Sequence, residues 1–94
     1  MTGEARHYRK QGMLLKQDEQ FAAAIIAFDK ALDLGAKGSG RIYQSIAESY
    51  FYLEKYKPAY AAIKKAIKDP KSRRGARGWV SFIKDTAQRK KIAI

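Results

Sequence analysis

An internal repeat of 35 residues is the feature that most constrains this chain. Along residues 21–34, apolar residues recur at spacings of three and four, which is the pattern of a helix with one buried face. The residues of that face are Phe21, Ala24, Ile25, Phe28, Ala31 and Leu32. Counterparts of the same class follow 35 positions later, at Tyr56, Ala59, Tyr60, Ile63, Ala66 and Ile67. One unit cannot bury its apolar face alone, so the repeat predicts stacked helical hairpins whose function lies in their surfaces.

The same period relates the helices expected to precede these two. Tyr8, Gly12 and Leu15 lie along one stripe of residues 4–17, and residues 40–53 repeat that stripe 35 positions later. Glycine within a helix costs about 1 kcal/mol relative to alanine, so Gly12 predicts the close approach of a neighbouring helix. The chain therefore contains two copies of one hairpin.

A last helix is expected at residues 73–91. Trp79 follows Tyr43 by 36 residues and Phe82 follows Ile46 by 36, so this helix would begin a third hairpin. A stacked array needs a terminal element of this kind with one face that water can wet. The helix is therefore expected to cap the array.

The expected fold class is all-α, with about five helices in a right-handed superhelical stack. The chain forms a single domain over residues 1–94, with one hairpin at about 5–38, a second at about 40–70 and the capping helix at about 73–91.

Positive charge is concentrated in the last forty residues. Seven basic and seven acidic residues balance over residues 1–54, whereas 13 basic residues against two acidic ones give residues 55–94 a charge of +11. A basic half favours an anionic partner, such as an acidic protein, nucleic acid or anionic lipid. The alternative is an end of the molecule that only keeps it soluble through self-repulsion.

Several function classes are not expected. The chain has no cysteine, hence no disulfide or thiolate metal site, and no run of about 18 apolar residues that a membrane span needs. His7 is the only histidine and is expected on a wet face, so no metal site and no serine triad is expected. The carboxylates fall at turns and outer faces and form no acid/base pair. We expect no enzyme activity and no cofactor.

The helix pattern resembles the tetratricopeptide repeat (TPR), a helix–turn–helix unit of about 34 residues. The positions that carry the resemblance are Tyr8, Gly12, Leu15, Ala24, Phe28 and Ala31 in the first hairpin, and Tyr43, Ile46, Ala47, Tyr50, Ala59, Ile63, Ala66 and Pro70 in the second. The chain departs from the family at Gln11, where leucine is usual, and at Glu19 and Glu54, where a turn glycine is common. The resemblance covers nearly the whole chain and implies a protein-binding function.

The end of the chain resembles a narrower group, the bacterial TPR proteins encoded beside TonB energy-transduction systems. The residues that carry this second resemblance are Ala76, Trp79, Val80, Phe82, Ile83 and Lys84. It implies the C-terminal piece of a periplasmic or envelope-associated protein. Without it, a cytoplasmic protein is expected, and the sequence leaves the localisation open.

The TPR resemblance also implies a concave groove, lined by the first helix of each hairpin, that holds a peptide or partner segment. Its expected residues are Arg6, Arg9, Met13, Lys16, Gln17, Arg41, Gln44, Glu48, Phe51, Tyr52, Arg77 and Lys84. Phe51 and Tyr52 fall outside the buried stripe, and exposed aromatic residues beside arginine are typical anchors for a partner. The alternative is that Phe51 covers the next hairpin.

Some TPR domains clamp a C-terminal carboxylate, and arginines in the groove could grip one. Met13 stands where that clamp has asparagine, and Glu48 would repel a carboxylate, so the standard clamp is not expected. The partner expected is a protein or peptide of acidic or mixed charge.

Two other functions remain as alternatives. The chain could associate with itself as a scaffold, a homodimer covering apolar residues 92–94. It could instead bind nucleic acid or an anionic membrane through a C-terminal basic patch. The residues of this patch are Lys64, Lys65, Lys68, Lys71, Arg73, Arg74, Arg89, Lys90 and Lys91. Nucleic acid ranks last, because the aromatic residues belong to the helix-packing pattern and not to a basic face.

Overall fold

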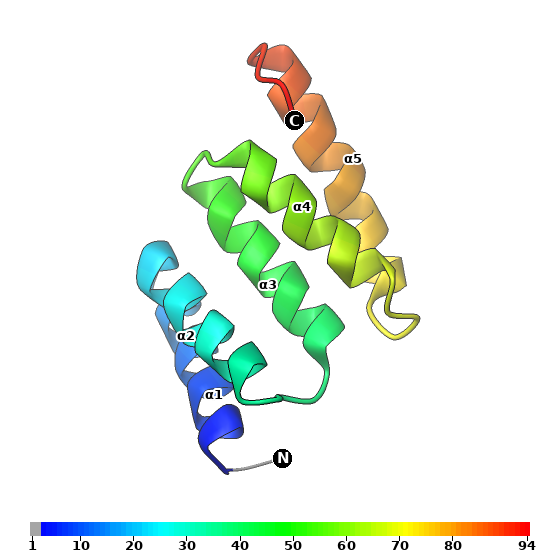
Figure 1. Ribbon diagram of the computed structural model, residues 1–94. Helices are drawn as coiled ribbons and strands as arrows, with labels where there is room; N and C mark the ends of the chain where they lie inside the picture. Colours follow the sequence, from blue (N-terminus) through cyan, green and yellow to red (C-terminus); the bar gives the residue numbers. More distant parts are fainter. Residues whose placement is uncertain (1–2) are drawn as a thin grey trace.

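The computed structural model describes residues 3–94, and this part of the chain forms five α-helices and no strand (Figure 1). The helices are α1 (Gly3–Gln17), α2 (Phe21–Asp33), α3 (Ser39–Tyr52), α4 (Tyr56–Ile67) and α5 (Arg73–Arg89). The predicted all-α class and five helices are confirmed, with boundaries within two residues of those expected.

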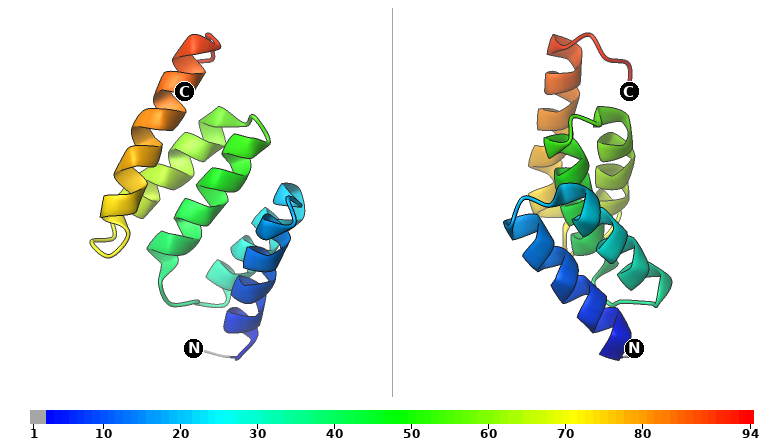
Figure 2. Two further views of the ribbon diagram at one scale, coloured as in Figure 1. Left: turned by 180° about the vertical axis from the view of Figure 1, so that it is seen from behind. Right: turned by 90° about the vertical axis from the view of Figure 1, so that its left-hand side faces the viewer.

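The helices form two stacked hairpins followed by one more helix. Helices α1 and α2 pack antiparallel, α3 and α4 repeat the arrangement, and α5 lies against α4 (Figures 1 and 2). The hairpins meet through α2 and α3, and α3 also contacts both α1 and α5. The molecule is elongated along the stack, with extents of 42 × 28 × 18 Å. The first helices, α1 and α3, together with the start of α5, therefore border one side of the array.

Small residues allow the helices of each hairpin to approach closely. Phe28 of α2 is fully buried against Gly12 of α1, where an added Cβ would lie 2.7 Å from the phenyl ring. In the second hairpin the equivalent position of Phe28 is Ile63, which is also fully buried. The close approach predicted from Gly12 is thus confirmed, and the ring of Phe28 is the neighbour that requires it.

One residue of α5 is more exposed than its counterpart on α3. Ile83 and Thr86 are buried, but Phe82 is 47% exposed, whereas Ile46, with which the sequence spacing pairs it, is only 4% exposed. The ring of Phe82 packs on that of Phe51, with centroids 4.9 Å apart. Two other aligned pairs, Gly40 with Ala76 and Ala47 with Ile83, are buried on both helices, so the alignment holds there. Phe82 differs because no helix follows α5 in the described residues to cover that side.

A hydrogen-bonded turn with a left-handed residue ends α2. Gly35 has a φ of +79°, its N–H donates to the carbonyl of Leu32 at 3.0 Å, and the next N–H, of Ala36, donates to that of Ala31 at 3.0 Å. This pair of bonds is the Schellman motif, in which glycine is usual. Glu19 and Glu54 hold the same place after α1 and α3, each with a φ of 60°. Those two turns are thus made without the residue that favours them.

Replacing Glu19 with glycine is expected to stabilise the protein by about 0.5–1 kcal/mol. The left-handed conformation costs a residue with a Cβ roughly 1–2 kcal/mol, and the extra freedom of glycine in the unfolded chain offsets part of the gain. Urea unfolding followed by circular dichroism measures the difference. Gly35→Ala is the matched control and should lower stability, since alanine is strained at that φ. Equal stability of Glu19→Gly and the original chain would contradict the expectation.

None of the helices within residues 3–94 has the length and apolarity to cross a bilayer.

Candidate functional site

A groove of about 740 Å³ lies between α1, α3 and the start of α5. Six of the expected residues line it, namely Arg6, Arg9, Met13, Gln17, Arg41 and Gln44. The structure adds residues that were not expected there: Lys10, Leu14, Phe28, Ile42, Ser45, Lys71, Ser72 and Gly75. The groove therefore lies where the first helices of the array meet.

Helical spacing places the lining side chains on one side of each helix. Arg41, Gln44, Glu48 and Tyr52 follow one another at intervals of three and four along α3, so they form one stripe, and Arg41 and Gln44 of this stripe line the groove. The start of α5 completes the wall, where Gly75 lies beside the Gln44 side chain. The two arginine-bearing helices and the bare backbone of Gly75 thus enclose one depression.

The charge of the groove is positive. Arg6, Arg9, Lys10, Arg41 and Lys71 line it, and none of the described lining residues is acidic. The guanidinium of Arg9 donates to the backbone carbonyl of Lys37 at 3.3 Å, which holds this side chain at the end of the groove beside the α2–α3 loop. Several cations around one depression raise the local concentration of anions and attract carboxylates. The groove is therefore suited to an anionic ligand.

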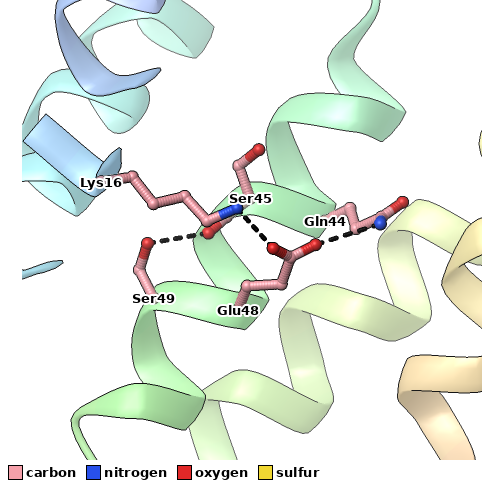
Figure 3. A network of polar contacts seen from close by, with 5 residues as sticks. All are labelled: Lys16, Gln44, Ser45, Glu48 and Ser49. Atoms are coloured by element: carbon pink, nitrogen blue, oxygen red, sulfur yellow. Dashed lines mark hydrogen bonds and ion pairs between the residues drawn. The ribbon is translucent and has the colours of Figure 1, made fainter. Parts of the chain in front are cut away.

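A polar network crosses the middle of the same surface (Figure 3). Lys16 of α1 forms an ion pair with Glu48 of α3, and the amide Nε2 of Gln44 donates to the other carboxylate oxygen of Glu48 at 3.0 Å. Beside it, the hydroxyl of Ser49 donates to the carbonyl of Ser45 at 2.8 Å. Glu48 was expected to repel a carboxylate, but its charge is matched by Lys16. Both side chains therefore tie α1 to α3.

The two aromatic residues expected in the groove lie in different surroundings. Phe51 is partly buried and packs against Trp79 and Phe82 of α5, with ring centroids 5.6 and 4.9 Å away. Tyr52 is 53% exposed, and its ring stacks on that of Phe21 at 5.0 Å with the planes 24° apart. Phe51 thus joins α3 to α5, which was the alternative reading, while Tyr52 remains available to a partner.

Arg77 and Lys84 do not line the groove. Gly75 faces Gln44, and Phe82 touches Phe51, so these two positions mark the side of α5 that meets α3. Arg77 and Lys84 each follow one of them by two residues, which is about 200° around a helix. The side chains of Arg77 and Lys84 are therefore exposed on the side of α5 away from α3. Their expected place in the groove was implied by the TPR resemblance, and the residues that line the groove do not include them.

The expected basic patch is divided between the two ends of α5. Lys68, Lys71, Arg73 and Arg74 lie at the α4–α5 turn, and Arg89, Lys90 and Lys91 lie at the far end, about 25 Å away along a helix of 17 residues. Lys64 and Lys65 lie on α4, with their ammonium groups over the rings of Tyr60 and Tyr43 at 5.1 and 5.2 Å. The structure therefore does not gather these residues into one patch.

Part of this basic charge is also engaged by neighbouring groups. Lys90 forms an ion pair with Glu54 at 2.8 Å, and this hydrogen bond lowers the pKa of the Glu54 carboxyl and raises the pKa of the Lys90 ammonium. The guanidinium Nε of Arg73 donates to the carbonyl of Ile67 at 3.0 Å, and the guanidinium Nη2 of Arg89 donates to the hydroxyl of Thr86 at 3.2 Å. These contacts fix helix ends and reduce the charge available at the far end of α5.

Lys10 and Lys71 line the groove but were not expected there, and they differ in whether the sequence could have predicted their place. Lys10 follows Arg6 by one helical turn, so its place was readable from the stripe on the first helix. Lys71 belongs to the α4–α5 turn, and only the packing of α5 beside α3 brings it to the groove. The spacing of residues in the sequence does not predict a position such as that of Lys71.

Within the described residues, no three His, Cys, Asp or Glu side chains gather where they could hold a metal ion. Comparison with protein-family models, curated proteins and solved structures gave no match. The groove is thus the feature that bears most directly on function.

Proposed function

We propose that this protein is a non-catalytic, TPR-like interaction module that binds an acidic segment of a partner protein in the groove between α1, α3 and α5. The observation that carries the proposal is the groove's charge, five basic and no acidic residues among the described side chains that line it. The two stacked helical hairpins support the TPR-like assignment.

The shape of the groove favours a peptide over a compact ligand. It is an open depression that crosses three helices, so a chain can lie across it without entering an enclosed cavity. Met13 and Leu14, which are about half exposed, lie among the cations and supply apolar contact area that a purely ionic site would lack. A peptide backbone with acidic side chains satisfies both features.

Nucleic acid fits the structure less well. Binding to a phosphate backbone needs cations along a continuous track, and here the basic residues at the two ends of α5 are separated along the helix. Single strands are also held by several rings on which successive bases stack, whereas Phe51 and Trp79 pack against each other and leave Tyr52 as the exposed ring of α3. The peptide reading therefore has the stronger support.

Arg41→Gln is expected to weaken the binding of a glutamate-rich peptide about fivefold or more. Arg41 is exposed at the start of the α3 stripe, and one charge-assisted hydrogen bond contributes about 1.5–3 kcal/mol before solvent screening reduces it. Fluorescence anisotropy of a labelled peptide gives the dissociation constant.

Arg77→Gln is the matched control, because it removes an equal charge from the exposed far side of α5. Its binding should stay within about twofold of the original chain, since at physiological salt exposed charges more than about 8 Å apart interact weakly. Equal losses in the two variants would indicate attraction by overall charge and would contradict a groove site.

A further inference from the structure

We propose that the binding surface is bipartite: the groove takes the carboxylates of a partner segment, and Tyr52, beyond the groove on the same stripe of α3, takes a large aromatic side chain of that segment. This inference rests on the proposed function and names the class of partner it takes. The acidic end would meet Arg6, Arg9, Arg41 and Lys71, and the aromatic side chain would meet Tyr52.

The anionic subsite is where three helices bring cations together. Arg41 begins α3, Lys71 precedes α5, and Arg6 and Arg9 belong to the first half of α1. Arg9 is already oriented by its bond to the Lys37 carbonyl. An oriented guanidinium loses less freedom when a carboxylate binds, so this end is prepared for an anion.

The aromatic subsite lies at the other end of the same stripe. Tyr52 is the last residue of α3, is 53% exposed, and is held by stacking on Phe21 and by an edge contact to Trp79 at 6.3 Å. A ring that is both exposed and fixed from behind offers contact area at little entropic cost. Tyrosine and tryptophan in such positions are the residues most often found as binding hot spots.

The charged side chains between the two subsites neutralise each other. Lys16 and Glu48 pair there, and Gln44 completes the bonds of the carboxylate (Figure 3). This middle section therefore attracts neither a carboxylate nor a cation strongly. Partner residues that cross it need only be small or neutral.

The distance between the subsites sets the spacing in the partner. Arg41 and Tyr52 are eleven residues apart on one helix, which corresponds to about 16 Å at a rise of about 1.5 Å per residue. An extended chain covers about 3.3 Å per residue, so about five residues span this distance. The segment is thus an acidic cluster with tryptophan or phenylalanine about five positions away.

The test uses the full chain and two labelled peptides with blocked ends, Glu-Glu-Glu-Gly-Ser-Gly-Ser-Trp and its reverse, which places the tryptophan on the other side of the acids. Anisotropy titrations compare each peptide with versions in which Trp is replaced by Gly or each Glu by Gln. We expect one of the two directions to bind, with about a tenfold loss for either replacement. Tyr52→Ala should cause a similar loss with the tryptophan peptide and no loss with the glycine peptide.

Each outcome decides between the two proposals. If the Trp-to-Gly peptides bind as tightly as the originals, the bipartite inference fails and the acidic groove remains. If none of the peptides binds, the proposed function fails as well. A loss in Tyr52→Ala that is equal for the tryptophan and glycine peptides would show a structural effect of the substitution and would overturn the contact. Circular dichroism of Tyr52→Ala checks that the variant is folded.

Discussion

Replacing Phe28 with alanine is expected to destabilise the protein by about 3–5 kcal/mol. The side chain is fully buried and fills the space between α1 and α2, so its removal loses the transfer free energy of the ring and leaves a cavity. A chain of 94 residues has a total stability of about 5–14 kcal/mol, so this loss removes a large part of it. Urea unfolding followed by circular dichroism measures the change.

Substitution of Gly12 tests whether the ring of Phe28 or only the hydrophobicity of the site determines which residue position 12 tolerates. In the original chain, Gly12→Ala should be destabilising by about 1–2 kcal/mol, since its Cβ would lie 2.7 Å from the buried ring. In the Phe28→Ala background the clash is absent, and the higher helix propensity of alanine should make the same substitution stabilising by up to about 1 kcal/mol. The sign should therefore reverse. The same sign in both backgrounds would show that the two residues do not constrain each other.

Gly40→Ala is expected to cost about 2–3 kcal/mol and to weaken peptide binding as well. A Cβ at this position would come within 2.3 Å of the hydroxyl of Ser72 and 2.5 Å of the carboxylate of Asp69, both in the α4–α5 turn. That turn cannot easily yield, because Ser72 is buried and its hydroxyl donates to the carbonyl of Ala66 at 2.7 Å. Overpacking of this kind forces backbone shifts.

The displaced turn would also move Lys71 and Gly75, which line the groove. Thermal unfolding gives the loss of stability, and anisotropy with the glutamate-rich peptide gives the loss of binding. Gly78→Ala in α5 is the matched control. A Cβ there has no atom within 4 Å, so this variant should be about 0.5–1 kcal/mol more stable and should bind normally. A stable, fully binding Gly40→Ala would show that α5 tolerates a shift away from α3.

Local patterns predicted the helices well, because each depends on residues close together in sequence. The spacing of apolar residues along α2 and α4 marks their buried faces, and Gly35 ends α2 as a left-handed residue. The turns at Glu19 and Glu54 formed without glycine, because the packing of each hairpin outweighs the local cost of a positive φ. Tertiary contacts thus overrode the local preference only where the preference was small.

The groove was predicted less completely than the helices. Of the expected residues on α1 and α3, six line the groove, whereas Lys16, Glu48, Phe51 and Tyr52 of the same helices do not. Arg77 and Lys84 of α5 do not line it either. Glu48 was expected to repel a carboxylate, but Lys16, 32 residues away in the sequence, neutralises its charge.

The sequence by itself determined the number of helices, their buried faces and the repeat that stacks them, because burying one apolar face per helix leaves few arrangements. The tertiary structure alone decided the contact of α5 with α3, the division of the basic residues and the joining of Lys71 to the arginines of α1 and α3. The physical reason is that these features depend on how the side chains of helices distant in sequence pack against one another. Such packing depends on shape, and periodicity does not record it.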